Sequence, residues 1–358
     1  MTEATALKGQ GQPEPLQPGV PGAPGPQMNP GRIFQAFNAF QQSAAIKAAA
    51  ELEIFTRIGE GLTTVEQIAR HLHASERGVR ILCDYLTVMG LITKQTGHYS
   101  LTPEAAFFLD RRSPGYIGSA ANFMIAPEMT RAYENLAGAV LKGGTTMSED
   151  GTVSAENPLW VEFARSMAPL MVLPAEVIAQ QVGAGAGEKW KVLDIAAGHG
   201  LFGLTIARHN PHAEIVAVDW PQVLEVAKEN ARKLGVDGRF STIPGSAFEV
   251  QFGSGYDLVL ITNFLHHFDD STCESFLRKV HAALKPGGRA VTLEFVPNDD
   301  RVSPPEAATF SMIMLGTTPH GDAYTFAEFD QMFRNAGFAR SEHFRPPQSP
   351  ESVIVSYK

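Results

Sequence analysis

The sequence has little cysteine: only Cys83 and Cys273 occur, far apart and in no paired pattern. This excludes a zinc site of the Cys-x-x-Cys type and is typical of proteins in a reducing compartment. No apolar run reaches the roughly 18 residues that a membrane-spanning helix needs. No apolar stretch follows a basic start at the N-terminus, so a secretory signal peptide is not expected. We therefore expect a cytoplasmic protein that does not span a membrane.

Basic residues are also in the minority, because 29 lysines and arginines face 38 aspartates and glutamates. The resulting net charge of -9 argues against broad nucleic-acid binding, although it is compatible with a local basic patch. With 358 residues, of which an ordinary 44% are hydrophobic, the chain is long enough for two globular domains and additional segments.

The stretch with the clearest pattern runs from Lys191 to Trp220 and has the sequence KVLDIAAGHGLFGLTIARHNPHAEIVAVDW. It predicts a buried strand, a glycine loop, a helix over residues 201–208 and a second strand that leads to Asp219, which together fit one βαβ unit. Glycines in the loop allow a sharp turn and a close approach of the backbone to a ligand. The amides that open the helix face the same ligand. We infer a nucleoside-cofactor site in which Asp219 accepts hydrogen bonds from both ribose hydroxyls.

The surroundings of the glycines indicate which cofactor this site binds. Gly198, Gly200 and Gly203 form the G-x-G-x-x-G fingerprint of dinucleotide sites, with an acid about twenty residues further on. However, only one such half is present, whereas a dinucleotide fold uses two. Asp194 ends the first strand, where it would meet a cationic amino-acid end. The run from Asp194 to Gly200, together with residues 284–288 (LKPGG), resembles motif I and the turn before the fifth strand of class I methyltransferases. We therefore favour S-adenosyl-L-methionine over a dinucleotide and over a glycine loop without a cofactor.

Composition and periodicity divide the chain into four segments. Residues 1–31 are rich in Pro, Gly and Gln and are predicted to be a disordered tail. Residues 32–112 are predicted to form a winged-helix dimerisation domain. Residues 113–186 are predicted to form a helical linker that contributes to the substrate pocket. Residues 187–358 are predicted to form the S-adenosylmethionine-binding methyltransferase domain.

The winged-helix prediction rests on a helix over residues 33–58, two shorter helices and a hairpin within residues 91–101. Thr63 or Thr64 begins the second helix, with Glu66 near its third position in a capping-box pattern. Two functions compete for this domain. It could bind DNA through a recognition helix over residues 75–84. The leading helix, rich in Phe and Ala, is more apolar than one small domain needs, so we favour dimerisation.

The remaining pattern predicts an α/β protein with a Rossmann-like methyltransferase sheet, mostly parallel with an antiparallel last strand, beside the N-terminal all-α, winged-helix domain. An apolar strand such as residues 256–261 suits a buried parallel sheet. Further strands are predicted at residues 240–243, 289–295, 340–344 and 352–357, and helices at 221–235, 270–284, 307–315 and 325–336.

A polar loop, residues 263–270 (NFLHHFDD), follows the fourth predicted strand. Ligands of open α/β sheets bind at the carboxyl ends of the strands, so this loop faces the cofactor. The pKa of a free histidine lies near 6.5, and His266 can therefore act as a base at neutral pH. Glu294 ends the neighbouring strand, where it could accept the other ring N–H and fix the tautomer.

Residues 33–358 resemble the dimeric small-molecule O-methyltransferases of the plant caffeate and hydroxyindole type, which have bacterial relatives. The resemblance rests on the winged-helix start, motif I, Asp219, the histidine before an aromatic-acidic turn, the Lys-Pro-Gly-Gly turn and Tyr324-Thr325-Phe326. It implies S-adenosyl-L-methionine as cofactor and a homodimer formed through the N-terminal domain. It assigns the catalytic base to His266 and its first supporting glutamate to Glu294.

The sequence departs from this family at several positions. His267 stands where an aspartate often follows the base, and Ala323, beside Asp322, stands where a second supporting glutamate is usual. Ser246 replaces an acid of the third cofactor motif, and Thr262 replaces a lysine. The base is therefore less firmly supported than usual, and methylation of carbon or nitrogen by the same fold remains an alternative to methylation of oxygen.

The candidate site residues fall into three groups. The catalytic pair is His266 and Glu294. The residues expected to hold the cofactor are Asp194, Ala196, Gly198, Gly200, Asp219, Trp220, Ser246, Phe248, Asn263, Phe163 and Met167. The residues expected to line the substrate pocket are Phe123, Met124, Phe264, His267, Phe295 and Met314.

Aromatic and methionine side chains dominate the substrate group, which predicts a small, flat, largely apolar acceptor, aromatic or polyketide-like. Three other hypotheses stay open at this point. His266 and His267 could bind a metal, although neighbouring side chains on an extended backbone point apart. A dehydrogenase would need a second nucleotide-binding half. A regulator would use the winged helix on DNA and the α/β domain as a ligand sensor.

Overall fold

The computed structural model describes residues 29–347 and 349–358. The predicted disordered tail, residues 1–31, therefore lies almost entirely outside the described residues. The chain divides into two compact units, residues 1–42 and 43–358, and helix α1 (Gly31–Glu51) begins in the first and ends in the second. Over the described ranges, no helix has the length and apolar character needed to cross a bilayer.

Helix α1 carries exposed aromatic side chains on one side. Phe34, Phe37 and Phe40 are 59%, 68% and 68% exposed. Because a contiguous apolar face is unusual on a monomer, this face indicates a contact surface. The predicted continuous helix up to Ile58 was wrong in one respect: Glu53 adopts a left-handed conformation with a φ of 54° and separates α1 from the next helix.

The winged-helix elements follow in the predicted order. They are α2 (Ile54–Gly59), α3 (Val65–Leu72), α4 (Glu76–Val88), β1 (Ile92–Gln95) and β2 (His98–Leu101). Thr64 caps α3, and its side chain accepts a hydrogen bond from the Gln67 amide at 3.3 Å. The reciprocal partner of this capping box is Gln67, not Glu66 as the sequence suggested, because Gln67 occupies the third helical position.

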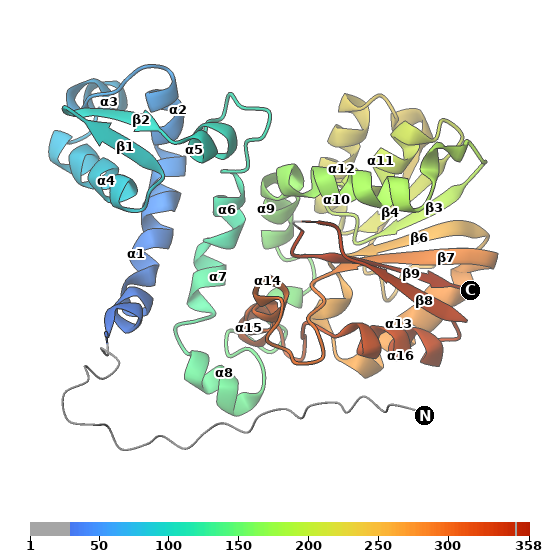
Figure 1. The fold of residues 1–358 in the computed structure, drawn as a ribbon. Helices are drawn as coiled ribbons and strands as arrows, with labels where there is room; N and C mark the ends of the chain where they lie inside the picture. Colours follow the sequence, from blue (N-terminus) through green and yellow to red (C-terminus); the bar gives the residue numbers. More distant parts are fainter. Residues whose placement is uncertain (1–28, 348) are drawn as a thin grey trace, which may run out of the picture. The chain divides into compact units, whose positions relative to one another are not determined.

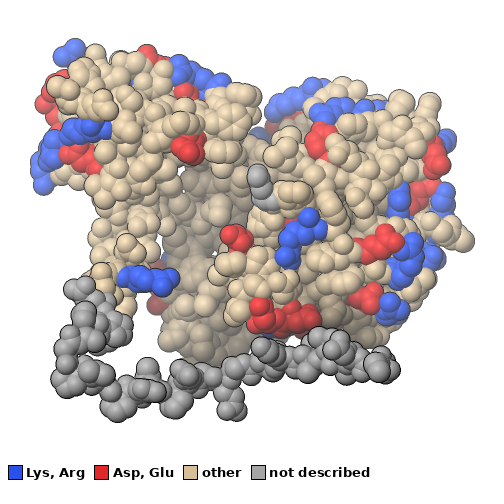
Figure 2. All heavy atoms as spheres, in the orientation of Figure 1, with Lys and Arg blue, Asp and Glu red and all other residues tan. Residues whose placement is uncertain are grey.

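The charges on this domain alternate in sign. Figure 2 shows acidic and basic side chains interspersed over the winged-helix elements rather than gathered in a basic patch. On α4, Arg80 pairs with Asp84 at 3.0 Å, and Lys94 of β1 pairs with the same carboxylate at 2.6 Å. Over residues 75–84, the candidate recognition helix has two arginines, Arg77 and Arg80, and two acids, Glu76 and Asp84. It therefore offers no net positive charge for phosphates, which weakens the DNA-binding hypothesis.

A series of short helices connects the winged helix to the central sheet. Pro127 begins one of them, Gly143 ends another, and Pro158 caps a third, so the predicted breaks coincide with helix ends. The elements are α5 (Pro103–Phe108), α6 (Ala120–Met124), α7 (Pro127–Arg131), α8 (Leu136–Lys142), η1 (Gly151–Val153), α9 (Leu159–Ser166), α10 (Ala168–Gln181) and η2 (Ala184–Ala186).

The central sheet has seven strands in the order β5-β4-β3-β6-β7-β9-β8 (Figure 1). The first five run parallel to one another, and β9 pairs antiparallel with both β7 and β8. This confirms the predicted methyltransferase sheet with an antiparallel last strand. The strands are β3 (Lys191–Ile195), β4 (Glu214–Asp219), β5 (Phe240–Pro244), β6 (Tyr256–Thr262), β7 (Leu284–Glu294), β8 (Arg340–Phe344) and β9 (Ser352–Tyr357).

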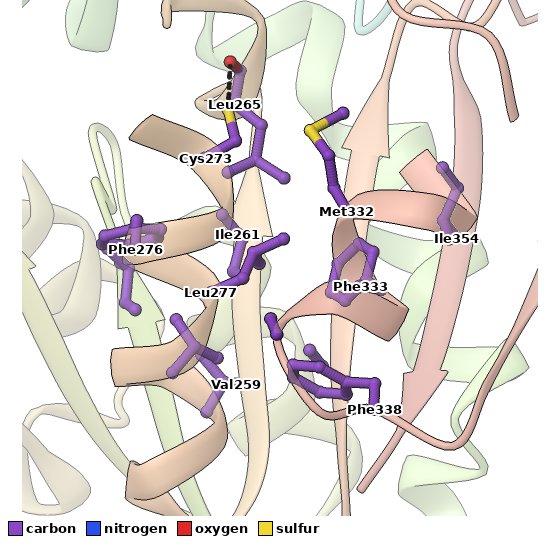
Figure 3. Close-up of a cluster of buried hydrophobic side chains, with 14 of the residues drawn as sticks. Val259, Ile261, Leu265, Cys273, Phe276, Leu277, Met332, Phe333, Phe338 and Ile354 are labelled. Atoms are coloured by element: carbon purple, nitrogen blue, oxygen red, sulfur yellow. Dashed lines mark hydrogen bonds between the residues drawn. The ribbon is translucent and has the colours of Figure 1, made fainter. Parts of the chain in front are cut away.

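Helices cover both faces of this sheet, so its strands are buried on two sides. One apolar cluster joins β6 to α13 (Asp270–Ala283) and α16 (Phe326–Asn335), and Figure 3 shows the side chain of Leu277 pointing toward Phe333 in it. A second cluster joins the other face to α10 and α11 (Leu201–His209). Helix α12 (Pro221–Lys233), followed by η3 (Asp237–Arg239), packs over the β4 side, where Leu224 contacts Ala217.

Two predicted elements differ in extent. Strand β7 begins at Leu284 and runs through the Lys-Pro-Gly-Gly turn, rather than beginning at Arg289. The inserted helix predicted over residues 307–315 is two helices, α14 (Pro305–Ala308) and α15 (Phe310–Thr317), which meet at Thr309. The Thr309 amide and hydroxyl both donate to the carbonyl of Pro305, the first residue of α14, at 2.9 and 2.8 Å.

Candidate functional site

A cavity of ≈ 1870 Å³ lies within residues 107–351, at the carboxyl ends of the sheet strands. The loops after β3, β4 and β5 form one end of it. The loop after β6, helix α9 and helix α15 form another. This volume exceeds that of an ordinary drug-sized pocket and leaves room for two ligands side by side.

Asp219 lies at the first end of the cavity, where its carboxylate accepts hydrogen bonds from two backbone amides. Its Oδ2 accepts a hydrogen bond from the Gly198 amide at 2.7 Å, and its Oδ1 accepts one from the Trp220 amide at 2.7 Å. Burial raises the pKa of Asp219 to about 6, and the two amides oppose that shift. Each carboxylate oxygen keeps a second lone pair, so the group can accept two more hydrogen bonds, as the two hydroxyls of a ribose require.

The glycine loop leaves space for a cofactor in front of Asp219. Ala196 and Gly198 adopt left-handed conformations, with φ of 52° and 55°. A Cβ built on Gly198 would stand 3.8 Å from Cε1 of Phe163, in open cavity space, so the absence of a side chain keeps this space free. A carboxylate with free lone pairs beside this open space is the acceptor that the two hydroxyls of an adenosine ribose need, and S-adenosylmethionine fits this end.

Two predicted cofactor residues stand behind the loop rather than on the cavity wall. Asp194 is fully buried, and its Oδ2 accepts a hydrogen bond from the Gly203 amide at 3.0 Å. Its Oδ1 has no hydrogen-bond partner among the described residues, and burial raises the pKa of Asp194 to about 8. A Cβ on Gly200 would come within 3.0 Å of Ala227. Both residues shape the loop, and neither lines the cavity.

The raised pKa of Asp219 predicts a pH-dependent nucleoside affinity. We expect the Kd for 5′-methylthioadenosine, which carries the ribose but no amino acid, to rise about tenfold from pH 8 to pH 5. The ribose hydroxyls donate to the ionised carboxylate, and the free protein protonates it as the pH falls below its pKa of about 6. Calorimetric titration at several pH values measures this effect. The Asp219→Asn variant should bind more weakly and without this dependence; a constant Kd in the wild type would contradict the assignment.

His266 and Glu294 form a buried pair at the second end. Nδ1 of His266 contacts Oε2 of Glu294, and both side chains are almost completely buried. The other oxygen, Oε1, accepts hydrogen bonds from the amides of Phe264 at 3.1 Å and Leu265 at 2.9 Å. These amides hold the carboxylate in place below the ring. Burial lowers the pKa of His266, so its imidazole is neutral at pH 7. Burial also raises the pKa of Glu294 to about 8, and the two amides oppose that shift. When the Glu294 carboxylate is ionised, it accepts the Nδ1 proton, and Nε2 of His266 then carries the free lone pair.

The local backbone explains how His266 comes to face Glu294. Asn263 follows β6 in a left-handed conformation with a φ of 52°, which turns the chain sharply out of the sheet. Its amide still donates to the Leu293 carbonyl of β7 at 2.8 Å. The short helix η4 (Leu265–His267) then places His266 directly over the end of β7, where Glu294 stands.

His267 lies beside the base but is oriented differently. Its Nδ1 stands 3.1 Å from the Phe264 carbonyl, which can only accept, so Nδ1 carries the proton and Nε2 is a free acceptor. The two imidazole rings are 4.2 Å apart, and the Trp160 ring packs edge-on against His267 at 5.4 Å. Burial is the main cause that lowers the pKa of His267 to about 3, so this ring is also neutral. Within the described residues, no cluster of three or more metal-binding side chains occurs.

The remaining wall at this end is apolar. Phe295 and Phe310 stack with ring centroids 3.9 Å apart, and Phe310 also packs edge-on against His266 at 4.8 Å. Two hydroxyls on the wall are already engaged as donors: Thr152 donates to the Thr317 carbonyl at 3.1 Å, and Thr317 donates to the Ile313 carbonyl at 2.7 Å. The wall therefore offers flat apolar surfaces and hydrogen-bond acceptors.

Most residues that the sequence singled out stand on the cavity wall. Those that do not are Asp194 and Gly200, behind the loop, and Glu294, behind His266. Asp322, next to Ala323, does not reach the base, because it pairs with Arg301 at 3.2 Å. The predicted residues that line the cavity are Phe123, Met124, Phe163, Met167, Ala196, Gly198, Asp219, Trp220, Ser246, Phe248, Asn263, Phe264, His266, His267, Phe295 and Met314.

Among the wall residues that the sequence prediction left without a role, two matter for the site. Trp160 was placed in the helical linker without a role, although its spacing of three from Phe163 on α9 predicts a shared helix face. The rings of Trp160 and Phe163 are 5.8 Å apart and form the wall together. Glu351 was not considered, because a single acid in a Pro- and Ser-rich loop carries no motif.

Comparison with known proteins identifies two domains of one enzyme family in this chain. Residues 155–339 match a family model for the O-methyltransferase domain, and residues 34–111 match one for the O-methyltransferase dimerisation domain. The structure is similar to the crystal structure of a candidate O-methyltransferase from Nostoc punctiforme, with a TM-score of 0.90 and 53% identity over 93% of this chain and 100% of that one.

Two further relatives extend the comparison. The chain is 28% identical, over 94% of its length and 98% of the relative, to 3-hydroxy-5-methyl-1-naphthoate 3-O-methyltransferase of Streptomyces sahachiroi. Human N-acetylserotonin methyltransferase, solved with S-adenosylmethionine, shares the fold, with a TM-score of 0.81 and 21% identity over 93% of this chain and 99% of that chain.

Proposed function

Since the chain belongs to the O-methyltransferase family and is an S-adenosylmethionine-dependent O-methyltransferase, we propose that it methylates a hydroxyl of a small aromatic acceptor with His266 as general base. The observation that carries this proposal is the buried pair of His266 and Glu294. In this pair, Nδ1 of His266 contacts Glu294, which leaves Nε2 of His266 free on the side of the cavity. Asp219, on the same cavity wall, supplies the ribose site for the cofactor.

The proposed chemistry assigns one task to each group. Bound S-adenosylmethionine supplies the electrophilic methyl group. Nε2 of His266 takes the hydroxyl proton of the acceptor as its oxygen attacks, and the ring becomes an imidazolium. Glu294 holds the Nδ1–H in place and stabilises the new positive charge. Positioning of the two reactants contributes roughly 7–11 kcal/mol, and the base about 10²–10⁴-fold in rate.

The wall at the acceptor end favours a flat, uncharged molecule. The stacked pair of Phe295 and Phe310, together with Trp160, lines the cavity with flat apolar surfaces on which a ring can pack. Arg111 is the one cation on the wall in the described part of the chain, and it already pairs with Glu53 at 2.9 Å. An acidic acceptor therefore finds no free positive charge. Nε2 of His267 can accept a hydrogen bond from a second polar group of the acceptor.

We also propose a homodimer formed through the N-terminal domain. Residues 34–111 match the dimerisation domain of the family. The exposed face of α1 with Phe34, Phe37 and Phe40 is the apolar surface that such an interface would cover. The two free, buried thiols, Cys83 and Cys273, suit a reducing compartment, and we place the protein in the cytoplasm.

Incubation with S-adenosylmethionine and matched neutral and carboxylated phenols, such as a naphthol and a hydroxynaphthoic acid, tests the acceptor. We expect a methyl ether, identified by mass spectrometry and proton NMR, with the neutral phenol preferred by about tenfold or more. This preference follows from the lack of a free cation on the described wall. A product methylated on a ring carbon, with its hydroxyl intact, would contradict hydroxyl methylation. An equal rate with the carboxylated phenol would contradict the neutral-acceptor proposal.

A further inference from the structure

Glu351 is a buried carboxylate on the cavity wall that the proposed chemistry does not use. It directly precedes β9, its side chain is 3% exposed, and it lines the cavity. None of the described lysines, arginines or histidines forms an ion pair with it. Its amide donates to the Ser349 hydroxyl oxygen at 3.1 Å, which fixes the backbone of the loop.

Burying an unpaired carboxylate destabilises the folded protein unless a cation or a proton neutralises its charge. Burial raises the pKa of Glu351 to about 7, the nearby charge of Glu294 adds to this shift, and hydrogen bonding by the Asn263 amide opposes it. The group is therefore available as an anion at pH 8. A buried acid with a perturbed pKa in a cleft is a candidate binding group, provided that its position fits a ligand.

The position of Glu351 fits the amino-acid end of the cofactor. Asn263 directly follows β6, and its side-chain amide lies near enough to Glu351 to lower the pKa of that carboxyl. The same side-chain amide reaches the Met171 sulfur of α10 at 3.8 Å. Asp219 ends β4, and β3 lies between β4 and β6. A cofactor whose ribose binds Asp219 and whose methyl group points toward His266 crosses the end of β3, so its amino-acid end comes close to Asn263 and Glu351.

The other acids near the cavity are less suitable. Asp194, which the sequence suggested for the cationic end, is buried beneath α11 and does not line the cavity. Asp219 is committed to the ribose. Glu249 and Glu306 are on the wall but are exposed to solvent, where an ion pair contributes little. Among the described wall residues, Glu351 is thus the one buried carboxylate that is available.

We propose that the Glu351 carboxylate binds the α-ammonium group of the methionine end of the cofactor, in the role that the sequence suggested for Asp194. This inference rests on the proposed function, because it takes the ribose site at Asp219 and the acceptor site at His266 as given. It makes Glu351 a determinant of cofactor affinity. The chemical group that it recognises is a primary ammonium.

A ligand pair isolates this contact. S-adenosylhomocysteine and its deamino analogue differ only in the α-ammonium group, and calorimetry at pH 8 measures both Kd values. We expect deamination to weaken binding to the wild type about 10–100-fold, as for a charge-assisted hydrogen bond. In Glu351→Gln, which keeps the shape and loses the charge, S-adenosylhomocysteine should bind about 10–100-fold more weakly, and the analogue nearly as in the wild type.

Glu306→Gln is the matched control, because it removes one negative charge from the exposed rim of the same cavity. Its ratio of the two Kd values should equal that of the wild type. Analogue binding also reports that Glu351→Gln is folded. If Glu351→Gln keeps the wild-type ratio, the inference is overturned while the proposed function stands. If the wild type binds neither ligand, both are overturned.

Discussion

The His266→Ala variant should lose about 10²–10⁴-fold in kcat while its Kd for S-adenosylhomocysteine stays within about threefold of the wild-type value. The imidazole is the group that faces the acceptor hydroxyl, and it makes no contact at the Asp219 end of the cavity. Steady-state kinetics with the best neutral phenol and calorimetry with the cofactor product measure the two quantities separately. An unchanged kcat would remove His266 from the role of base.

Glu294→Gln provides a second, more specific variant of the same pair. A glutamine can present its amide N–H to Nδ1 of His266, which moves the ring proton to Nε2 and removes the lone pair that faces the acceptor. We expect kcat to fall by about 10²-fold or more, although the imidazole is still present. His281→Ala is the control, because this histidine packs against Phe338 at 5.1 Å, is not on the cavity wall, and should leave kcat unchanged.

Local sequence patterns predicted the elements around the cofactor because each residue there has a local physical reason. The left-handed Gly198 and Gly200 need glycine, the buried strand β3 needs apolar side chains, and Asp219 must follow a strand to reach the ribose. The catalytic pair was also predictable, because His266 lies in the loop that follows β6 and Glu294 ends the adjacent strand β7. Parallel pairing brings together positions that are far apart in the sequence.

Side-chain direction at the end of a strand was harder to predict. Asp194 and Asp219 both stand near the ends of parallel strands, and the sequence suggested that both would face the ligand. The structure turns Asp194 under α11, where the Gly203 amide binds it, because the helix packs closely on β3. Glu351 shows the opposite case: nothing local marks it, and only the antiparallel β9, paired with β7, carries it to the cavity.

Close packing at Gly203 leads to a prediction that local helix preference alone would get wrong. Gly203 lies inside α11, where alanine usually stabilises a helix by about 0.5–1 kcal/mol relative to glycine. Here, a Cβ would stand 2.7 Å from Cγ2 of Ile215 and 2.8 Å from Oδ2 of Asp194. Gly203→Ala must therefore push α11 away from the sheet and disturb the hydrogen bond that holds Asp194.

We expect Gly203→Ala to lower the free energy of unfolding by about 1–3 kcal/mol, the usual cost of overpacking, as measured by denaturant titration. The affinity for S-adenosylhomocysteine should fall by about tenfold or more, because α11 begins directly after the glycine loop that faces the ligand. Gly238→Ala is the matched control: no atom lies within 4 Å of its built Cβ, and both quantities should stay at wild-type values. A Gly203→Ala variant as stable as Gly238→Ala, with unchanged affinity, would mean that the spacing between α11 and the sheet does not hold the loop in its binding conformation.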